Sequence, residues 1–451
     1  MPELFGTDGV RAVANTPPLT PQQVTALGFA AGQWYRSRGE NGTVLVGRDT
    51  RLSGPMLEAA LVAGLTSSGL RVELAGVIPT PAVSWLVREL GALGGAVISA
   101  SHNPFEDNGV KFFRADGSKL AESEEDQIEA LLRQDPLPGQ ALVTGSRIGT
   151  CGPIRKPLDL YLAHAVSTLA GDRPLAGLRI VCDCANGAAA RTTPAALRRL
   201  GAKVTALNIR PNGVNINRGC GSLHFEVLAA AVRRRPGNLG ITHDGDADRV
   251  LMCDESGGLV DGDRMLGLLG RWLAPRELLP GRKVVATIMA NAGLDEALEP
   301  LGITVVRAQV GDRRVHDEML RHGATLGGEP SGHIILRELG PTGDGLLTAL
   351  AVLRVMREEG ATLADLAGVV RLYPTYAGAV RVSRKPPLDS LEPVARAIDD
   401  ARHGVAPRGR VVVRYSGTEP VARVLVEGPD EALVRRLGQA IEASLRASLG
   451  T

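Results

Sequence analysis

Three aspartates alternate with small residues in the segment HDGDADRV, which covers residues 243–250. Asp244, Asp246 and Asp248 are two positions apart, so an extended turn would point their carboxylates to one side. Three hard oxygen donors suit Mg²⁺ better than zinc. A solvated acidic turn is one alternative and a calcium EF-hand is another. The EF-hand is disfavoured because Arg249 stands at the sixth loop position, where that motif needs glycine.

A second candidate lies in VISASHNPFEDNGVKFF, residues 97–113, where an apolar run breaks at Ser101. A serine hydroxyl needs a base to act as a nucleophile, whereas a phosphorylated serine is itself a phosphoryl donor whose oxygens can bind metal. Ser101 could equally cap a following helix, and His102 could be satisfied by local backbone. From these residues alone, Ser101 stays open as nucleophile, phosphoryl carrier or helix cap.

Two further loops carry polar groups typical of sugar-phosphate binding. The segment RYSGTEPVAR, residues 414–423, offers guanidiniums, hydroxyls and exposed amides that could hold a phosphate, although a hairpin turn with surface arginines is the alternative. In GGEPSGH, residues 327–333, Glu329 and Ser331 could hold sugar hydroxyls and His333 a hydroxyl or phosphate, or the segment is an ordinary turn. Lys111 could stabilise phosphoryl charge or transfer a proton, or reach solvent as strand lysines often do.

The elements that must position these loops follow a repeated pattern. Strand-like and helix-like stretches alternate in three rounds, which end in SASHNP, DGDADR and GEPSGH. Alternating strands and helices predict crossover connections and mainly parallel sheets, and ligands bind such sheets at the carboxyl ends of the strands. Three polar loops in matching positions therefore predict one shared functional region.

The pattern predicts three similar α/β domains with mixed or parallel sheets, followed by a smaller C-terminal α+β domain. After about Leu372 it changes to short strands and two helices around GRVVVRYSGTEPVARVLVEG. The connection at 137–154 and the junction near 254–258 separate the first three rounds. We predict domains at 1–150 with the Ser101 loop, 151–254 with the aspartate loop, 255–371 with the GEPSGH loop and 372–451 with the phosphate loop.

Composition excludes several classes of protein. The chain has 451 residues, 44% hydrophobic and 22% charged, with a formal net charge of +2. That balance provides no global field for nucleic acid or membranes, and 3% aromatic residues argue against base stacking. Five cysteines without paired CxxC spacing predict free thiols in a reducing cytoplasm, and the N-terminus has no apolar signal region. The residues of the four polar loops together predict Mg²⁺-dependent phosphoryl transfer on a sugar phosphate. A Mg²⁺-assisted serine phosphatase fits these loops nearly as well.

The four loops, in this order and spacing, resemble the α-D-phosphohexomutase superfamily over essentially the whole chain. Further stretches that carry the resemblance are FGTDGVR at 5–11, SASHNPFEDNGVKFFRADGSKL at 99–120, CDCANGAAA at 182–190, NGVNINRGCGS at 212–222 and GPTGDGLLTAL at 340–350. The first of these and NINRGCGS resemble the branch that acts on glucosamine phosphates. The resemblance implies four domains around a central cleft.

It also implies a role for each matching residue. Ser101 would be the phosphoserine and a ligand of one Mg²⁺ together with Asp244, Asp246 and Asp248. Arg11 and Lys111 match positions near the transferring phosphoryl group, and His102 is included with them as a catalytic candidate. Glu329 and Ser331 would bind sugar hydroxyls, and His333 of the same loop is kept with them as a substrate-binding candidate. The phosphate that is not reacting would be held by Arg414, Ser416, Gly417, Thr418 and Arg423.

The implied reaction interconverts glucosamine 6-phosphate and glucosamine 1-phosphate, upstream of UDP-N-acetylglucosamine and cell-wall synthesis. It runs through a hexosamine 1,6-bisphosphate, which is intermediate or primer. Mannose or glucose phosphates are the substrates of sister branches and remain the alternative. Relatives are often dimers through the first domain, so a homodimer is a further expectation, and no nucleic acid or membrane partner is expected.

Four positions depart from the branch pattern. Pro330 stands where glutamine is common, Tyr415 where proline is common, and Arg314 where an aromatic residue is usual. Ala247 stands in the aspartate loop where many relatives have glycine, and it should matter little because the acids are intact. None of the four removes a functional group named above.

Overall fold

The computed structural model describes residues 4–6, 8–39, 42–133, 142–416 and 420–450. Contacts divide these residues into two compact units. The first unit contains residues up to 289 together with 303–369, and the second contains 290–302 together with the residues from 370 onwards. Each unit has its own core and is described by itself.

The first sheet of the larger unit has six strands in the order β1-β5-β4-β2-β3-β6. Its core is built from apolar side chains of the strands and of α1 and α2, among them the fully buried Tyr35, whose hydroxyl donates to the carbonyls of Gly95 and Phe113. The elements are β1 (Val10–Val13), α1 (Pro21–Arg36), β2 (Thr43–Arg48), α2 (Gly54–Ser67), β3 (Arg71–Val77), α3 (Thr80–Glu89), β4 (Gly94–Ile98), β5 (Asp107–Arg114), α4 (Glu122–Arg133) and β6 (Cys151–Pro153).

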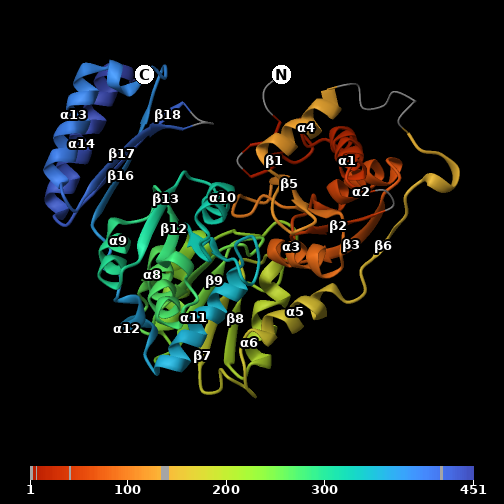
Figure 1. Cartoon of the computed structure of the whole chain (residues 1–451), viewed down its shortest axis with the longest axis horizontal. Helices are drawn as coiled ribbons and strands as arrows, with labels where there is room; N and C mark the ends of the chain where they lie inside the picture. Colours follow the sequence, from red (N-terminus) through yellow and green to blue (C-terminus); the bar gives the residue numbers. More distant parts are fainter. Residues whose placement is uncertain (1–3, 7, 40–41, 134–141, 417–419, 451) are drawn as a thin grey trace. The chain divides into compact units, whose positions relative to one another are not determined.

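The second sheet has the order β11-β10-β9-β7-β8, with helices from the same stretch of chain against it (Figure 1). Cys182 in β7 and Cys184, which follows the strand, are fully buried free thiols whose Sγ atoms are 3.5 Å apart. The elements are α5 (Pro157–Ser167), β7 (Arg179–Asp183), α6 (Thr193–Arg199), β8 (Lys203–Leu207), α7 (Phe225–Arg233), β9 (Leu239–His243), β10 (Val250–Cys253) and β11 (Leu259–Val260).

The third sheet has the order β13-β12-β14-β15. Its longest helix, α11, is capped by Asp344, whose side chain accepts a hydrogen bond from the amide of Leu347. The elements are α8 (Gly262–Leu273), β12 (Lys283–Thr287), β13 (Thr304–Ala308), α10 (Asp312–His322), β14 (Leu326–Gly328), β15 (Ile334–Leu336), α11 (Gly345–Glu359) and α12 (Leu363–Ala367).

All three sheets repeat one arrangement, as the alternation in the sequence predicts. A central strand (β2, β7 or β12) pairs in parallel with the next two strands of its round, and the third strand then pairs antiparallel with the strand that follows it. The three polar loops therefore join β4 to β5, β9 to β10 and β14 to β15. The sheets extend slightly past the predicted boundaries at 150 and 254, since β6 pairs with β3 and β11 pairs with β10.

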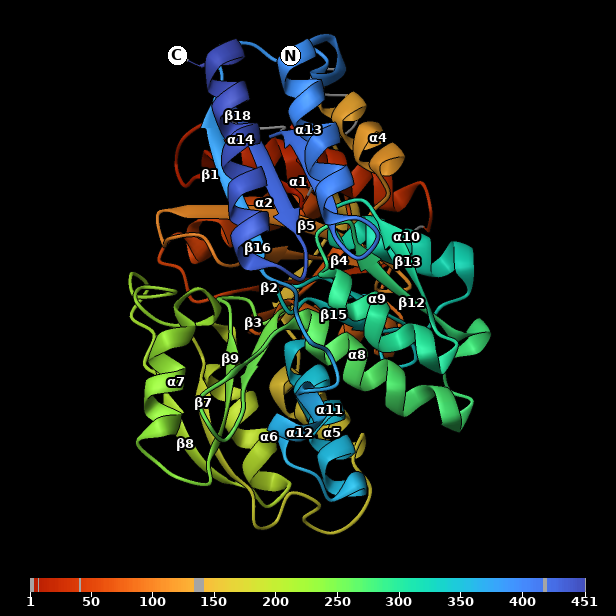
Figure 2. The same ribbon diagram turned by 90° about the vertical axis from the view of Figure 1, so that its left-hand side faces the viewer.

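The smaller unit is the predicted α+β domain with a short additional segment. Its antiparallel sheet has the order β16-β18-β17, and α13 and α14 lie together on one face of it (Figure 2). The elements are α9 (Ala292–Leu298), β16 (Thr375–Arg381), α13 (Glu392–Val405), β17 (Arg410–Tyr415), β18 (Val421–Glu427) and α14 (Glu431–Leu449). In the described part of both units, no helix is long and apolar enough to span a bilayer.

Candidate active site

Ser101 lies in the turn between β4 and β5 and is only 1% exposed. Its backbone is left-handed, with φ of 51°, a conformation that costs a non-glycine residue free energy and is common at functional sites. The amide of Ser101 donates to Ser99 Oγ at 2.9 Å. A turn and not a helix follows, so Ser101 is not a helix cap.

A buried arginine holds the Ser101 turn in place. Arg51 is 1% exposed, donates from Nε to Asp49 Oδ2 at 2.9 Å, and donates from Nη2 to the carbonyls of Ser101 and Asn103, each at 2.9 Å. Asn217 Nδ2 donates to the same two carbonyls at 2.9 and 3.0 Å. Sequence reasoning missed Arg51 and Asn217. For Arg51 the available signal was an arginine three residues after the end of an apolar strand, in RDTRLSG.

The aspartate loop joins β9 to β10 and meets the Ser101 turn. Ser101 Oγ donates to Asp244 Oδ2 at 2.6 Å. The approach requires glycine at position 245, because a Cβ there would lie 2.6 Å from the carbonyl oxygen of Ser101. The structure thus brings together the serine and the carboxylates that the sequence separates by more than 140 positions.

The three carboxylates form a buried group that fits a divalent cation. Asp244, Asp246 and Asp248 are at most 3% exposed, and one oxygen from each lies within 4.8 Å of the others. Burial, followed by the charges of Asp248 and Asp246, raises the pKa of Asp244 well above its usual range. In the described part of the chain, Asp246 Oδ1 and Asp248 Oδ1 are buried without a hydrogen-bond partner. Open, mutually repelling carboxylate oxygens are a donor set that Mg²⁺ satisfies.

Lys111 lies on β5 beside this group and is 2% exposed. Its Nζ is 2.9 Å from Asp8 Oδ2 and 3.1 Å from Asp246 Oδ2. Burial alone would lower the pKa of Lys111, but the charges of Asp246, Asp8 and Asp248 outweigh it and raise that pKa above its ordinary value. Lys111 is therefore a charged ammonium at neutral pH.

A chain of ion pairs continues from Lys111 towards the third sheet. Asp8 pairs with Arg11 and Lys119 as well as with Lys111, and Lys119 also pairs with Asp312 at the start of α10. Burial opposes ionisation of Asp8, but Lys111, Lys119 and Arg11 hold its pKa well below the usual range. Sequence reasoning identified Arg11 and Lys111 and missed the other three, because an isolated acid or lysine carries no local signal.

His102 and Arg249 complete the surroundings of Ser101. His102 Nδ1 is 3.4 Å from Ser101 Oγ. Burial, with the charges of Arg249 and Arg11, lowers the pKa of His102 to about 4, so its imidazole is neutral near neutral pH. Arg249 is half-buried, and its Nε is 3.9 Å from Asp248 Oδ1. It directly follows the aspartate loop, yet sequence reasoning gave it no role.

The GEPSGH loop lies between β14 and β15. Ser331 Oγ donates to Glu329 Oε2 at 3.3 Å, and the amide of Gly311 donates to Glu329 Oε1 at 3.1 Å. His333 is 2% exposed, and both of its ring nitrogens lie near polar protein atoms. The amide of Gly343 donates to His333 Nε2 at 3.0 Å, so the ring proton is on Nδ1, which is 3.6 Å from Asp248 Oδ2. The structure thus places His333 against the aspartate loop.

The candidate phosphate-binding residues lie in the smaller unit. Arg414 on β17 is the direct cross-strand partner of Arg423 on β18. Two like charges facing each other across a strand pair are unfavourable unless an anion or another group offsets them. Ser416 is buried, and its carbonyl accepts a hydrogen bond from Lys385 Nζ at 2.6 Å. Gly417 and Thr418 lie outside the described residues.

The four departures from the branch pattern have separate surroundings. Tyr415 packs against the apolar core of the smaller unit, and Arg314 forms an ion pair with Glu122 of α4. The carbonyl of Pro330 accepts a hydrogen bond from the amide of Gly262 at 3.1 Å. Ala247 is buried with a left-handed φ of 61°, which explains why glycine is common there.

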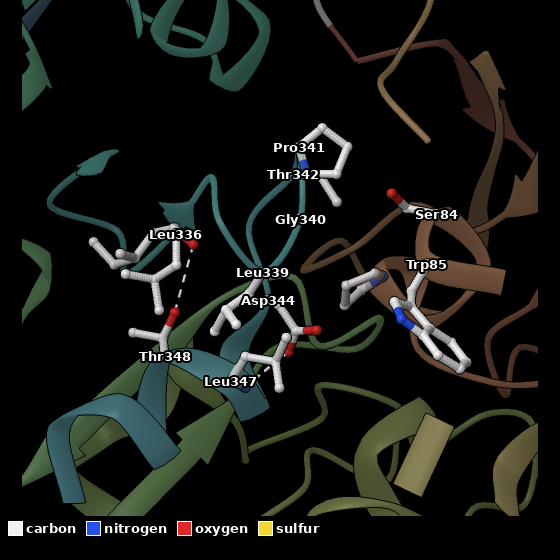
Figure 3. A pocket seen from close by; sticks show the side chains of 12 residues that line it. Ser84, Trp85, Leu336, Leu339, Gly340, Pro341, Thr342, Asp344, Leu347 and Thr348 are labelled. Carbon is white, nitrogen blue, oxygen red and sulfur yellow. Dashed lines mark hydrogen bonds between the residues drawn. The ribbon is translucent and has the colours of Figure 1, made fainter. Parts of the chain in front are cut away.

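A separate cavity beside α3 and α11 is too small for a sugar phosphate. It has a volume of about 20 Å³, which is room for about one water molecule. Trp85 lies on one side and Asp344 on the other (Figure 3). Tyr161 donates its hydroxyl to both carboxylate oxygens of Asp344, at 2.8 and 2.9 Å. The cavity is therefore a packing feature beside the helix cap and not the candidate site.

Comparison with known proteins identifies the family from the whole chain. Residues 2–137, 159–258 and 261–373 match the alpha/beta/alpha domains I, II and III of phosphoglucomutase/phosphomannomutase, and residues 379–444 match its C-terminal domain. The chain belongs to the phosphoglucomutase/phosphomannomutase family. It is accordingly a phosphohexomutase, an isomerase of the phosphotransferase type, and the family generally uses Mg²⁺ and a phosphoserine.

Similar curated proteins carry a more specific name. The chain is 48% identical to the phosphoglucosamine mutase of Symbiobacterium thermophilum, over 100% of both chains. It is 49% identical to the phosphoglucosamine mutase of Moorella thermoacetica, over 95% of this chain and 96% of that one. The resemblance recognised from the motifs is confirmed by these relatives.

Solved structures share the fold. A phosphoglucomutase/phosphomannomutase family protein of Burkholderia thailandensis is 24% identical with a TM-score of 0.81, covering 99% of this chain and 97% of that one. The N-acetylphosphoglucosamine mutase of Aspergillus fumigatus, in complex with GlcNAc-6P and magnesium, is 18% identical with a TM-score of 0.68, covering 99% and 96%. The predicted fold class, three α/β domains and a smaller C-terminal domain, is confirmed.

Proposed function

We propose that this chain is a phosphoglucosamine mutase that interconverts glucosamine 6-phosphate and glucosamine 1-phosphate. The observation that carries the mechanism is the placement of Ser101: its Oγ lies 2.6 Å from one of three buried carboxylates in a chain similar to phosphoglucosamine mutases over its whole length. Such an enzyme needs a phosphoryl carrier beside a cation site, and a sugar-phosphate sensor would need neither.

Asp244, Asp246 and Asp248 would hold one Mg²⁺, with an oxygen of phosphorylated Ser101 as a further ligand. Two of the carboxylates present buried oxygens that lack hydrogen-bond partners in the described structure, which supports this assignment. The chemistry that a bound Mg²⁺ supplies in such a site is neutralisation of charge on phosphoryl oxygens.

Phosphoryl transfer runs between Ser101 and the two ends of the sugar. The P–O bond to Ser101 Oγ breaks as a bond forms to a sugar hydroxyl oxygen, which gives a hexosamine 1,6-bisphosphate. The bisphosphate reorients, and its other phosphoryl group returns to Ser101 Oγ. The hydroxyl proton lost in the first transfer is matched by a proton gained by the sugar oxygen in the second, so the cycle is balanced.

The cations around Ser101 stabilise the charge of the group in transfer. Lys111 is assigned this electrostatic role because the raised pKa keeps it protonated, which makes it a poor base. Arg11 is assigned the same role, because it pairs with Asp8, which Lys111 also contacts. His102 is assigned to proton transfer because its Nδ1 lies 3.4 Å from Ser101 Oγ, within reach of the reacting oxygen.

Recognition of the rest of the substrate is assigned to the other two loops. Glu329 and Ser331 are half-buried, and their side chains could exchange their mutual hydrogen bond for sugar hydroxyls. Arg414 and Arg423 face each other across a strand pair and would share a phosphate group, with Ser416, Gly417 and Thr418 as further donors. We also propose a cytoplasmic location and a homodimer, as in the expectations from the family.

The test measures product formation from glucosamine 6-phosphate with Mg²⁺ and a trace of hexose 1,6-bisphosphate, beside glucose and mannose 1-phosphates. Wild type should prefer the glucosamine substrate, and Ser101→Ala should abolish turnover. Ser68→Ala is the control, because Ser68 is also buried but donates to the carbonyl of Leu65 within α2 and its cap. Preference for glucose or mannose would overturn the sugar assignment, release of free phosphate would indicate a phosphatase, and full activity of Ser101→Ala would overturn the phosphoserine mechanism.

A further inference from the structure

Thr80 contacts the candidate metal loop from a different sheet. It is the first residue of α3, a helix that packs against the first sheet, and its side chain is fully buried. Its amide donates to the carbonyl of Asp246 at 2.9 Å, and its Oγ1 donates to Asp246 Oδ2 at 2.7 Å. Thr80 thus binds both the backbone and the side chain of Asp246, which lies 166 positions further along the chain.

The start of α3 makes this double contact available. The first amides of a helix have no acceptor within the helix, so the amide of Thr80 is free to bond to another segment. Pro79 and Pro81 flank Thr80, and Pro81 is tolerated in the first turn because its missing N–H would have no intrahelical partner. The positive end of the helix also faces an acidic loop, which is favourable.

The two oxygens of Asp246 are in different situations. Oδ2 accepts from Thr80 Oγ1 and also from Lys111 Nζ at 3.1 Å, so its hydrogen-bonding capacity is used. Oδ1 is buried and has no hydrogen-bond partner in the described structure. A buried carboxylate oxygen without a partner is costly, unless a cation occupies the position it faces.

Among the described residues, neither Asp244 nor Asp248 accepts a hydrogen bond from a hydroxyl outside the two loops. Asp244 accepts from Ser101 Oγ and, at 3.3 Å, from the amide of Arg249, both of which belong to the two loops themselves. Asp248 Oδ2 has Lys111 at 3.8 Å and His333 at 3.6 Å, beyond hydrogen-bond length. Among the three, Asp246 is therefore the carboxylate whose orientation is set by a neutral hydroxyl from outside both loops.

We propose that Thr80 is a positioning residue for the metal site: its hydroxyl fixes Asp246 so that Oδ1 faces the cation. This inference rests on the proposed function, because it assumes that the three aspartates bind Mg²⁺. Removing a group that orients a metal ligand typically weakens metal affinity about 10- to 100-fold. Thr80 donates to the oxygen that Lys111 also contacts, so it restricts the carboxylate further without adding a second positive charge near the cation.

The experiment measures the Mg²⁺ dissociation constant of the metal-stripped full-length protein by titration calorimetry. Thr80→Val keeps the shape and removes the hydroxyl, and Thr80→Ser keeps a hydroxyl. Ser84→Ala is the matched control, because Ser84 is buried on the same helix but donates to the carbonyl of Gly117 at 2.6 Å. Asp246→Asn reports whether Mg²⁺ binds at this loop at all.

We expect Thr80→Val to weaken Mg²⁺ binding about 10- to 100-fold, with Thr80→Ser and Ser84→Ala within about threefold of wild type. At saturating Mg²⁺, Thr80→Val should regain kcat while the KM for sugar phosphate stays unchanged. Wild-type affinity in Thr80→Val, or an equal loss in Ser84→Ala, would overturn the inference alone. Unchanged binding in Asp246→Asn would instead overturn the proposed metal site. If Thr80→Val does not fold, Thr80→Ala removes the same hydroxyl without a bulky side chain and is judged by the same criteria.

Discussion

The aspartate loop and the GEPSGH loop occupy the same place in their sheets and differ in what surrounds them. Each follows the third strand of a parallel set and leads into an antiparallel strand. The carboxylates of the aspartate loop are at most 3% exposed, and they are reached by side chains of the first sheet. Glu329 is half-buried, and it accepts hydrogen bonds from Ser331 Oγ and from the amide of Gly311, both in the region of the third sheet.

Strand order therefore decides where each loop lies, while burial and the neighbouring hydrogen-bond donors decide which ligand the loop can bind. A fully buried group of acids needs a cation or fixed positive charges to be stable. A half-exposed acid with one hydroxyl neighbour can exchange that neighbour for a ligand hydroxyl at little cost. The first environment suits phosphoryl chemistry and the second suits sugar recognition, and four predictions test this contrast.

The largest difference should appear when each loop loses one charge. Asp244→Asn should lower kcat about 10³-fold or more, because it weakens the cation site and changes the contact with Ser101 Oγ. Glu329→Gln should lower kcat/KM about 10- to 100-fold through weaker binding of a sugar hydroxyl. Glu338→Gln, an exposed acid beyond β15, is the control. Steady-state kinetics with glucosamine 6-phosphate measures all three, and equal losses in the first two would remove the contrast.

The backbone of the GEPSGH loop should tolerate less change than its side chains suggest. Gly332 has φ of +88°, and a Cβ there would lie 1.9 Å from the carbonyl oxygen of Val250 in β10. Gly332→Ala should therefore destabilise the protein by about 3 kcal/mol, measured by urea unfolding. Gly340→Ala is the control, since a Cβ at that glycine meets nothing within 4 Å. Equal stability of the two variants would contradict a close contact between the loops.

Asp344 lies near both loops, and its titration should make the free energy of unfolding depend on pH. It caps α11, whose Gly345 amide donates to the carbonyl of Ala247 at 3.1 Å. Burial raises the pKa of Asp344 to about 6, against the opposing effect of hydrogen bonds from the amide of Leu347 and from Tyr161. The folded protein therefore holds this proton more tightly than the unfolded chain does. Its stabilising contribution is complete below about pH 4 and is lost as pH rises through 6.

Comparison of wild type with Asp344→Asn isolates that contribution, because asparagine also caps helices and does not titrate. The free energy of unfolding of wild type, relative to the variant, should fall by about 2 kcal/mol between pH 4 and pH 7. Urea titrations at several pH values measure it. A difference that increases with pH would mean that the pKa of Asp344 is lowered and not raised.

The smallest effect is expected in the aspartate loop itself. Ala247→Gly relieves a left-handed backbone at φ of 61° but removes a buried methyl group and adds freedom to the unfolded chain. These terms oppose each other, so the net change in unfolding free energy should be under about 1 kcal/mol, with kcat unchanged. Thermal unfolding and kinetics check this, and a large loss of activity would show that the methyl group shapes the metal site.

Much of the fold could be predicted from the sequence because its signals are local. Apolar strands, helical periodicity and polar loops alternate in three rounds, and each round became a sheet with the same strand order. The change of pattern after Leu372 likewise marked the smaller unit. The short edge strands β6 and β11 extend past the predicted boundaries, because two or three residues carry too little periodicity to be read.

Some residues of the candidate site could likewise be predicted from local patterns, and others could not. Polar groups at strand ends could be recognised in three segments, the DxDxD spacing, SASHNP and GEPSGH. The structure brings Ser101, Lys111, Arg11 and the aspartates together. Arg51, Asn217, Asp8 and Lys119 were missed. Each is an ordinary polar residue in its own segment, and its partners lie far away in the chain.

Periodicity and spacing act between neighbouring residues, so they are enough to predict the strand and helix pattern, the three carboxylates on one turn and the serine at the end of an apolar strand. Packing of the folded chain is needed to bring Ser101 to Asp244, Thr80 to Asp246 and His333 to Asp248. These contacts join three sheets, and packing selects among the many polar residues that could in principle meet. Burial then sets the charge of each group, since desolvation and neighbouring ions shift a pKa only once the chain has folded.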